Sequence, residues 1–115
     1  MNINVLIATA VLFLPIALIA NEKGKLEGEY VLGGEVASRG IPKEGNTHLH
    51  IRLTGDMAKT LYKSSKAQPK KNDCTGYKHK TSGDFDCYEM VIEQSYACLF
   101  AINLEKNTVE SSSAC

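Results

Sequence analysis

The sequence has no tryptophan, no charged residue among its first twenty positions and no net charge. Nucleic-acid-binding proteins usually carry a basic surface, so this charge balance argues against that class. The H-E-x-x-H, P-loop and G-x-G-x-x-G motifs are missing, as is the G-x-S-x-G nucleophile elbow. These absences exclude the common signatures of zinc proteases, nucleotide-binding enzymes and serine hydrolases. We therefore predict a protein that is not an enzyme and uses no cofactor.

The first twenty residues, MNINVLIATAVLFLPIALIA, are followed directly by the polar segment NEKGK. An apolar run that ends on a small residue, here Ala20, is typical of a secretory signal peptide. The run is marginal in length for a membrane-spanning helix and contains Pro15. We expect residues 1–20 to be a cleaved signal and residues 21–115 to form one small domain, periplasmic or secreted, without stable membrane insertion. The alternative is an uncleaved anchor.

All four cysteines, Cys74, Cys87, Cys98 and Cys115, lie in the predicted mature domain. An even number of cysteines in a small exported chain indicates disulfides. A two-residue turn at Lys106–Asn107 would pair Glu105 with Thr108 and place Cys98 opposite Cys115, which favours a Cys98–Cys115 bridge. Cys74 would then pair with Cys87. The rival pairing joins Cys87 to Cys98 across the preceding hairpin and Cys74 to Cys115.

Two segments of the predicted domain alternate between apolar and polar residues, as strands with one buried face do. In residues 26–36 we expect the set that contains Tyr30 and Leu32 to face inward, and the glutamates to face solvent. In THLHIRLT, residues 47–54, the inward set is Leu49, Ile51 and Leu53, and the outward set is His48, His50 and Arg52.

The period becomes helical in TGDMAKTLYKSSKAQP, residues 54–69. Thr54 or Asp56 would cap the first turn, and Pro69 cannot continue the helix. One face of this helix is apolar and the other carries lysines, so the apolar face should pack on the sheet. The apolar face consists of Met57, Ala58, Leu61 and Tyr62, and the solvated side of Lys59, Lys63, Lys66 and Lys70.

Residues 70–84 form a polar connection, and strands at about Phe85–Ile92 and Tyr96–Leu104 follow, with a short last strand. Runs of strands around one helix indicate an α+β fold. We predict a small antiparallel sheet of four to five strands with one covering helix, stapled by disulfides.

Metal binding is the weakest of the chemical possibilities. His48 and His50 lie two residues apart on a strand, and His79 could supply a third nitrogen. Pairing of these histidines with glutamates on the preceding strand is the better interpretation. Asp84 and Asp86 are best interpreted as a solvated turn rather than a calcium site. We therefore predict no metal site.

Charge is unevenly distributed along the chain. Residues 57–80 contain seven lysines and one aspartate, a net charge of +6, and residues 81–115 contain six acids and one lysine, a net charge of −5. The acidic half would suit a basic protein partner, because complementary charge steers association. The lysine-rich half could face a polyanion such as lipopolysaccharide, or only water.

The segments LTGDMAKTLYK and YACLFAINL, with the four cysteines, give residues 47–115 a layout similar to small exported proteins of Gram-negative bacteria, mostly uncharacterised. The layout also resembles periplasmic inhibitor and immunity proteins, which insert a loop into an enzyme. SGDFDCY carries Ser82, Gly83 and Tyr88 of the lysozyme-inhibitor pattern, without the surrounding aromatic and glycine positions. The resemblance implies a non-catalytic periplasmic or secreted binding protein that acts on an envelope enzyme.

We expect a protein partner in the cell envelope, such as a basic enzyme, to contact the third strand and the loop before it. Tyrosines there would serve as amphipathic anchors. The candidate residues are Tyr77, Ser82, Gly83, Asp84, Asp86, Tyr88 and Glu89. The alternative functions are a structural or envelope-stress accessory protein and, further off, a histidine-based metal-binding protein.

Overall fold

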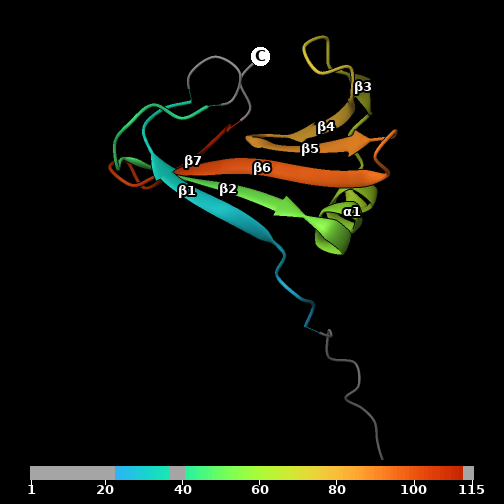
Figure 1. Ribbon diagram of the computed structural model, residues 1–115, viewed down its shortest axis with the longest axis horizontal. Helices are drawn as coiled ribbons and strands as arrows, with labels where there is room; N and C mark the ends of the chain where they lie inside the picture. The colour runs from blue at the N-terminus through green and yellow to red at the C-terminus, as the bar shows by residue number, and fades with distance from the viewer. Residues whose placement is uncertain (1–22, 37–40, 113–115) are drawn as a thin grey trace, which may run out of the picture.

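The computed structural model describes residues 23–36 and 41–112, so the predicted signal segment and Cys115 lie outside the described residues. The described part is an antiparallel sheet with one helix on one face (Figure 1). The elements are β1 (Gly28–Gly33), β2 (His48–Thr54), α1 (Gly55–Ser64), β3 (Lys70–Lys71), β4 (Lys78–Ser82), β5 (Phe85–Met90), β6 (Ser95–Asn103) and β7 (Thr108–Glu110). The α+β class is confirmed, but the sheet has seven strands rather than four to five.

The strand order is β1-β2-β6-β5-β4-β3, and β7 pairs with β6 beyond the end of β5. All the pairs are antiparallel. The long β6 therefore lies at the centre, β1 and β3 are the outermost strands of this order, and β7 is a short edge strand beside β6.

Helix α1 follows β2 without a connecting loop. Gly55 has φ +67, a conformation that glycine adopts without strain, and this allows the chain to turn from the strand into the helix. Thr54 occupies the N-cap position but makes no side-chain capping hydrogen bond with a described residue. Ala58 and Tyr62 are buried, and Met57 and Leu61 pack against the same cluster, so the predicted apolar face is confirmed.

The core lies where α1 crosses the sheet. Leu53 of β2 and the Cys87–Cys98 pair are buried beneath Ala58 and Tyr62. The Tyr62 ring contacts Tyr96 with a centroid separation of 5.4 Å. Because α1 spans only ten residues, this core occupies one end of the sheet, and no helix of the described residues covers the rest of that face.

The disulfide pairing that we expected is wrong. Cys87 and Cys98 lie directly opposite each other on β5 and β6, with Cα atoms 4.0 Å apart, and form a disulfide. Cys74 is disulfide-bonded as well. The error comes from the β6–β7 turn, which includes four residues, 104–107, and pairs Asn103 with Thr108. This register differs by two residues from the predicted one.

Two further expectations about the sheet are corrected. The polar connection of residues 70–84 contains β3 and β4, which form a hairpin that extends the sheet beyond β5. The inward face predicted for residues 47–54 is confirmed for Leu53 and Ile51, which belong to the core beneath α1, but the opposite face is buried as well: His48 and His50 are 5% and 7% exposed. Tyr30, expected to face inward, is 74% exposed. Alternation correctly identified which residues share a face, but not how far each face is covered.

Candidate functional site

The turn between β5 and β6 presents two aliphatic side chains to solvent. Residues 91–94, called here the hairpin tip, connect Met90 to its partner Ser95. Val91 is 59% exposed and Ile92 is 92% exposed. The Gln94 amide donates to the Val91 carbonyl at 3.2 Å, and Gln94 has φ 53, so the tip forms a closed turn. The Cys87–Cys98 disulfide ties the two strands together three residue pairs below Met90–Ser95.

A cleft of about 340 Å³ separates the hairpin tip from the loop between β3 and β4. Its lining residues are Thr75, Gly76, Tyr77, Lys78, Glu89, Val91 and Ile92. The β3–β4 loop is ordered by Asn72, whose Oδ1 accepts hydrogen bonds from the amides of Cys74 and Thr75 at 2.9 and 3.0 Å. The backbone N–H of Asn72 donates to the Tyr77 carbonyl at 2.8 Å. Both walls of the cleft are therefore held by contacts of their own.

The acidic side chain of Glu89 is one of the residues that line the cleft. The Tyr96 hydroxyl donates to Glu89 Oε2 at 3.1 Å. Burial and the neighbouring Glu89 carboxylate raise the pKa of both Tyr96 and Tyr62 above 10.0. Both phenols are therefore neutral at pH 7, and Glu89 is the acidic side chain that lines the cleft.

The sequence-predicted partner-binding residues fall into three groups. Tyr77 and Glu89 meet in the cleft. Ser82, at the end of β4, and the turn residues Gly83 and Asp84 are exposed at the opposite end of the β4–β5 hairpin. The remaining two, Asp86 and Tyr88, are buried.

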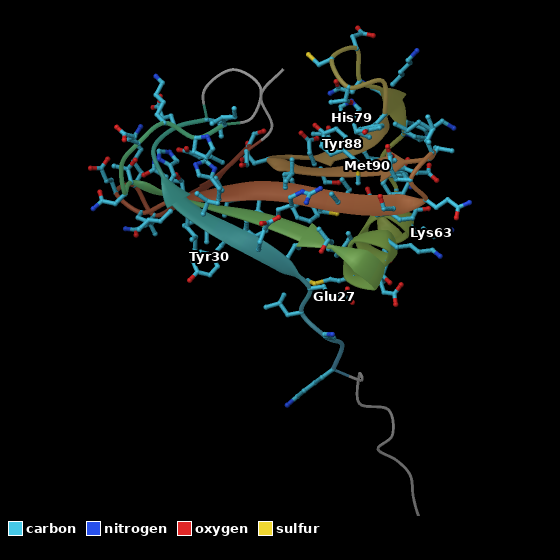
Figure 2. All side chains as sticks on the ribbon, viewed as in Figure 1. Glu27, Tyr30, Lys63, His79, Tyr88 and Met90 are labelled. Atoms are coloured by element: carbon cyan, nitrogen blue, oxygen red, sulfur yellow. A yellow bond between two sulfur atoms is a disulfide. The ribbon has the colours of Figure 1, made fainter. Side chains whose placement is uncertain are left out.

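Both buried residues of this set contact His79. Figure 2 shows Tyr88 and His79 together on the sheet face opposite α1. The Tyr88 ring stacks on the His79 ring with centroids 5.6 Å apart. Asp86 accepts a hydrogen bond from Thr81 and lies 3.7 Å from His79 Nδ1. Asp86 and Tyr88 therefore help to hold β4 on β5.

The His48 and His50 rings stack on the same face, with centroids 5.8 Å apart. His50 Nε2 donates to the Gly34 carbonyl at 2.7 Å, and its Nδ1 forms a hydrogen bond with the Ser112 hydroxyl at 2.9 Å. His48 Nε2 contacts Glu110 at 2.9 Å. His79 lies three strands from His50, and no group of three metal-ligating side chains occurs among residues 23–36 and 41–112.

Glu110 connects His48 to β7. Asn103 Nδ2 donates to its other oxygen at 2.9 Å. The hydrogen bond from Asn103, followed by that from His48, lowers the pKa of Glu110 below its ordinary value of 4.5. The network fastens β7 and Ser112 to the sheet, which is a structural role.

Sequence reasoning missed Val91 and Ile92 as surface residues. It assigned them to the end of a strand, where aliphatic side chains are normally buried. A signal was present, because Glu93 and Gln94 follow them directly and a polar pair between two strands indicates a turn.

Comparison with known proteins gives no family assignment: no protein-family model matches the chain, and neither a curated protein nor a solved structure is significantly similar to it. Within the described ranges, α1 falls short of the length and apolar character that a membrane-spanning helix needs.

Proposed function

We propose that this chain is a non-catalytic binding protein of an extracytoplasmic compartment, and that it binds a protein partner through the hairpin tip and the adjoining cleft. Inhibition of an envelope enzyme is the outcome that we expect of this binding. The observation that carries the proposal is Ile92, which is 92% exposed at the end of a disulfide-tied hairpin. Beside it, Val91 and Tyr77 line a cleft that a partner's side chain could fill.

Rigidity supports this assignment. An exposed loop must be ordered when it binds, which costs about 0.5–1.5 kcal/mol for each side chain that is immobilised. The Cys87–Cys98 bridge and the closed turn at residues 91–94 order the backbone of the hairpin before binding. The side chains of Val91 and Ile92 also have few rotatable bonds, so little entropy remains to be lost.

The disulfides support the compartment. Cys87, Cys98 and Cys74 are all disulfide-bonded, and such bonds persist in oxidising environments such as the periplasm or the exterior. The apolar segment of residues 1–20, which predicts a signal peptide, agrees with this location.

The charges near the tip favour a basic partner. Glu93 is exposed in the tip, and Glu89 lines the cleft beside its cross-strand partner Lys78, so Glu93 is the acidic group without a lysine opposite it in the sheet. Acidic groups around an apolar anchor raise the association rate with a basic surface, and salt weakens this effect. We expect Glu93→Lys to slow association with a basic partner and to reduce its salt dependence.

A non-catalytic function is favoured by the position of the histidines. Ser112 and His50 form the contact that activates serine nucleophiles, but Ser112 is 8% exposed and the cleft lies at the other end of the sheet. The contact between His50 and Ser112 instead fastens the segment after β7 to the sheet.

The test compares Ile92→Asp with Leu104→Asp. Leu104 is 46% exposed in the β6–β7 turn, at the other end of β6, and provides a matched control. Each variant is measured against purified periplasmic hydrolases, lysozymes included, for binding kinetics and inhibition. Removal of a side chain that anchors an interface costs at least about 2 kcal/mol of binding free energy, which corresponds to a roughly 30-fold weaker affinity. We expect this loss for Ile92→Asp and not for Leu104→Asp.

The proposal fails if the partner binds both variants and the wild type equally well. If the partner that depends on Ile92 is a structural envelope component rather than an enzyme, the alternative of an accessory protein replaces inhibition.

A further inference from the structure

The two edges of the sheet differ in how they are protected. Natural sheets prevent edge-to-edge pairing by short edge strands, lysines, prolines or bulges. At one edge, β3 has two residues, Lys70 and Lys71. At the other, β1 has six residues, GEYVLG, with Glu29 as its one charged side chain. No other described strand lies outside β1 (Figure 1).

The β1 edge also exposes apolar side chains on both faces. Tyr30 is 74% exposed, Leu32 is 52% exposed and Val31 is 49% exposed. Figure 2 shows Tyr30 on the same side of the sheet as α1, beyond the end that the helix covers. On that side an apolar row crosses four strands, from Leu32 through its partners Leu49 and Ile102 to Val109.

At the C-terminal end of β1, the outer edge of the strand is already covered by the segment around Lys43. Gly33 and Gly34 are buried, and the Gly34 amide donates to the Lys43 carbonyl at 2.7 Å. The open run is therefore residues 28–32, with Tyr30 at its centre. A strand that is open symmetrically about one residue suits antiparallel pairing with an identical strand.

We propose that the β1 edge binds a second copy of this chain, with the two β1 strands antiparallel and Tyr30 on the twofold axis. In this register Glu29 lies opposite Val31 of the second copy, so like charges do not meet. Leu32 lies opposite Gly28 of the second copy, where the absence of a side chain leaves room for it. The two Tyr30 rings lie side by side on the apolar face, an arrangement that aromatic pairs favour.

This complementarity is the reason for choosing a second copy rather than a foreign strand, because it needs only the chain's own residues. Such a two-fold contact is isologous, the common form of homodimer interface. The contact is small: a covered tyrosine buries about 150–250 Å², and interfaces below about 1,200 Å² in total are usually weak. We therefore expect dimerisation that depends on concentration in the micromolar range.

The first measurement is sedimentation of the mature chain from low micromolar to near-millimolar concentration. We expect a reversible monomer–dimer equilibrium that Tyr30→Lys abolishes, with an unchanged circular dichroism spectrum because Tyr30 is exposed. Val109→Lys is the matched control, since Val109 is 55% exposed on the same face but far from the β1 edge. A chain that stays monomeric throughout, or a dimer that both variants disrupt, would overturn edge pairing.

The second measurement tests the register by cross-linking. Side chains directly opposite each other in antiparallel strands have Cβ atoms about 4.5–5.5 Å apart, close enough for a disulfide after small adjustment. Tyr30→Cys should therefore give a covalent dimer on mild oxidation. Leu32→Cys should not, because the two substituted positions would lie four residues apart along the paired strands. Equal cross-linking of both variants, or of neither, would refute pairing about Tyr30.

Discussion

Substitution of Lys80 tests directly how α1 is held on the sheet. Its Nζ donates to the carbonyls of Tyr62 and Ser65, each at 3.0 Å, and lies 4.6 Å from the centroid of the Tyr62 ring. Both carbonyls are at the C-terminal end of α1, where the helix dipole favours a cation. A hydrogen bond to a charged group contributes about 1.5–3 kcal/mol, and an exposed cation–π contact about 0.5–1 kcal/mol. Lys80 is only partly buried, so the lower values apply, and we count the two hydrogen bonds of its single ammonium group as one charged interaction.

We expect Lys80→Met to lower the free energy of unfolding by about 2 kcal/mol, because methionine keeps the apolar stem and removes the ammonium group. For a domain of this size the melting temperature should fall by roughly 8–16 °C. Urea denaturation followed by circular dichroism would measure the change.

Lys78→Met is the control, because Lys78 lies two residues away on the same face of β4 and is exposed. Its effect should stay within about 0.5 kcal/mol. If the two variants lose the same stability, Lys80 is an ordinary surface lysine and its contacts with α1 contribute nothing measurable.

Two further predictions concern the covalent structure and the response to acid. Peptide mapping without reduction should join the Cys87 and Cys98 fragments and, by elimination, the Cys74 fragment to the C-terminal one, while the intact mass should equal the chain from Asn21 with four hydrogens lost. A Cys98–Cys115 fragment would contradict this pairing. Because the pKa of Glu110 is lowered from 4.5, its stabilising effect is present above that pH and is lost as the pH falls through the lower folded pKa. Glu110→Gln should therefore flatten the acid limb of the stability profile in thermal melts, and parallel acid limbs would argue against the network.

The apolar face of the helix and the two central hairpin strands could be predicted because their apolar residues have the required period. The predicted end of the helix near Pro69 is wrong, since α1 ends at Ser64 and leaves Lys66 and Lys70 outside it. Ala58 and Tyr62 lie on one helical face, and β5 and β6 begin within one residue of the expected positions. Each segment has an apolar set large enough to dominate its local sequence, so the periodicity was sufficient.

Strand β4 could not be predicted, because its packing surface is made of polar side chains. Lys80 contacts the Tyr62 ring and the end of α1, and His79 stacks on Tyr88. A long amphipathic side chain covers apolar surface with its stem while its charged end finds a partner. Hydropathy records such a residue only as charged, and KHKTS therefore resembled a loop.

The position of the last strand depended on a single side chain. Asn103 Oδ1 accepts hydrogen bonds from the amides of Glu105 and Lys106, each at 3.0 Å, and this stabilises a four-residue turn. Asparagine commonly forms such local contacts, but many turns with other lengths are also compatible with this sequence. The two-residue difference changed the residue opposite Cys98 and with it the predicted disulfide.

The covered faces were reversed for His50 and Tyr30 because alternation carries no information about what lies above a strand. The Gly34 carbonyl and Ser112 close over His50, and both come from distant parts of the chain. Tyr30 stays exposed because α1 is too short to reach β1. Only the tertiary structure relates these segments to the strand.

The hairpin tip and the β1 edge lie on different parts of the molecule, so the two proposals can be tested separately. The tip extends from the end of the sheet at which β1 begins, since Gly28 pairs with Leu53 and Leu53 with Cys98. A twofold axis through Tyr30 reverses the strand direction, and the two tips of a dimer would therefore point in opposite directions. Two such tips cannot both bind one small partner, so dimerisation would add a second independent site rather than strengthen the first. Failure of the β1 contact would accordingly leave binding by Ile92 intact, and the converse also holds.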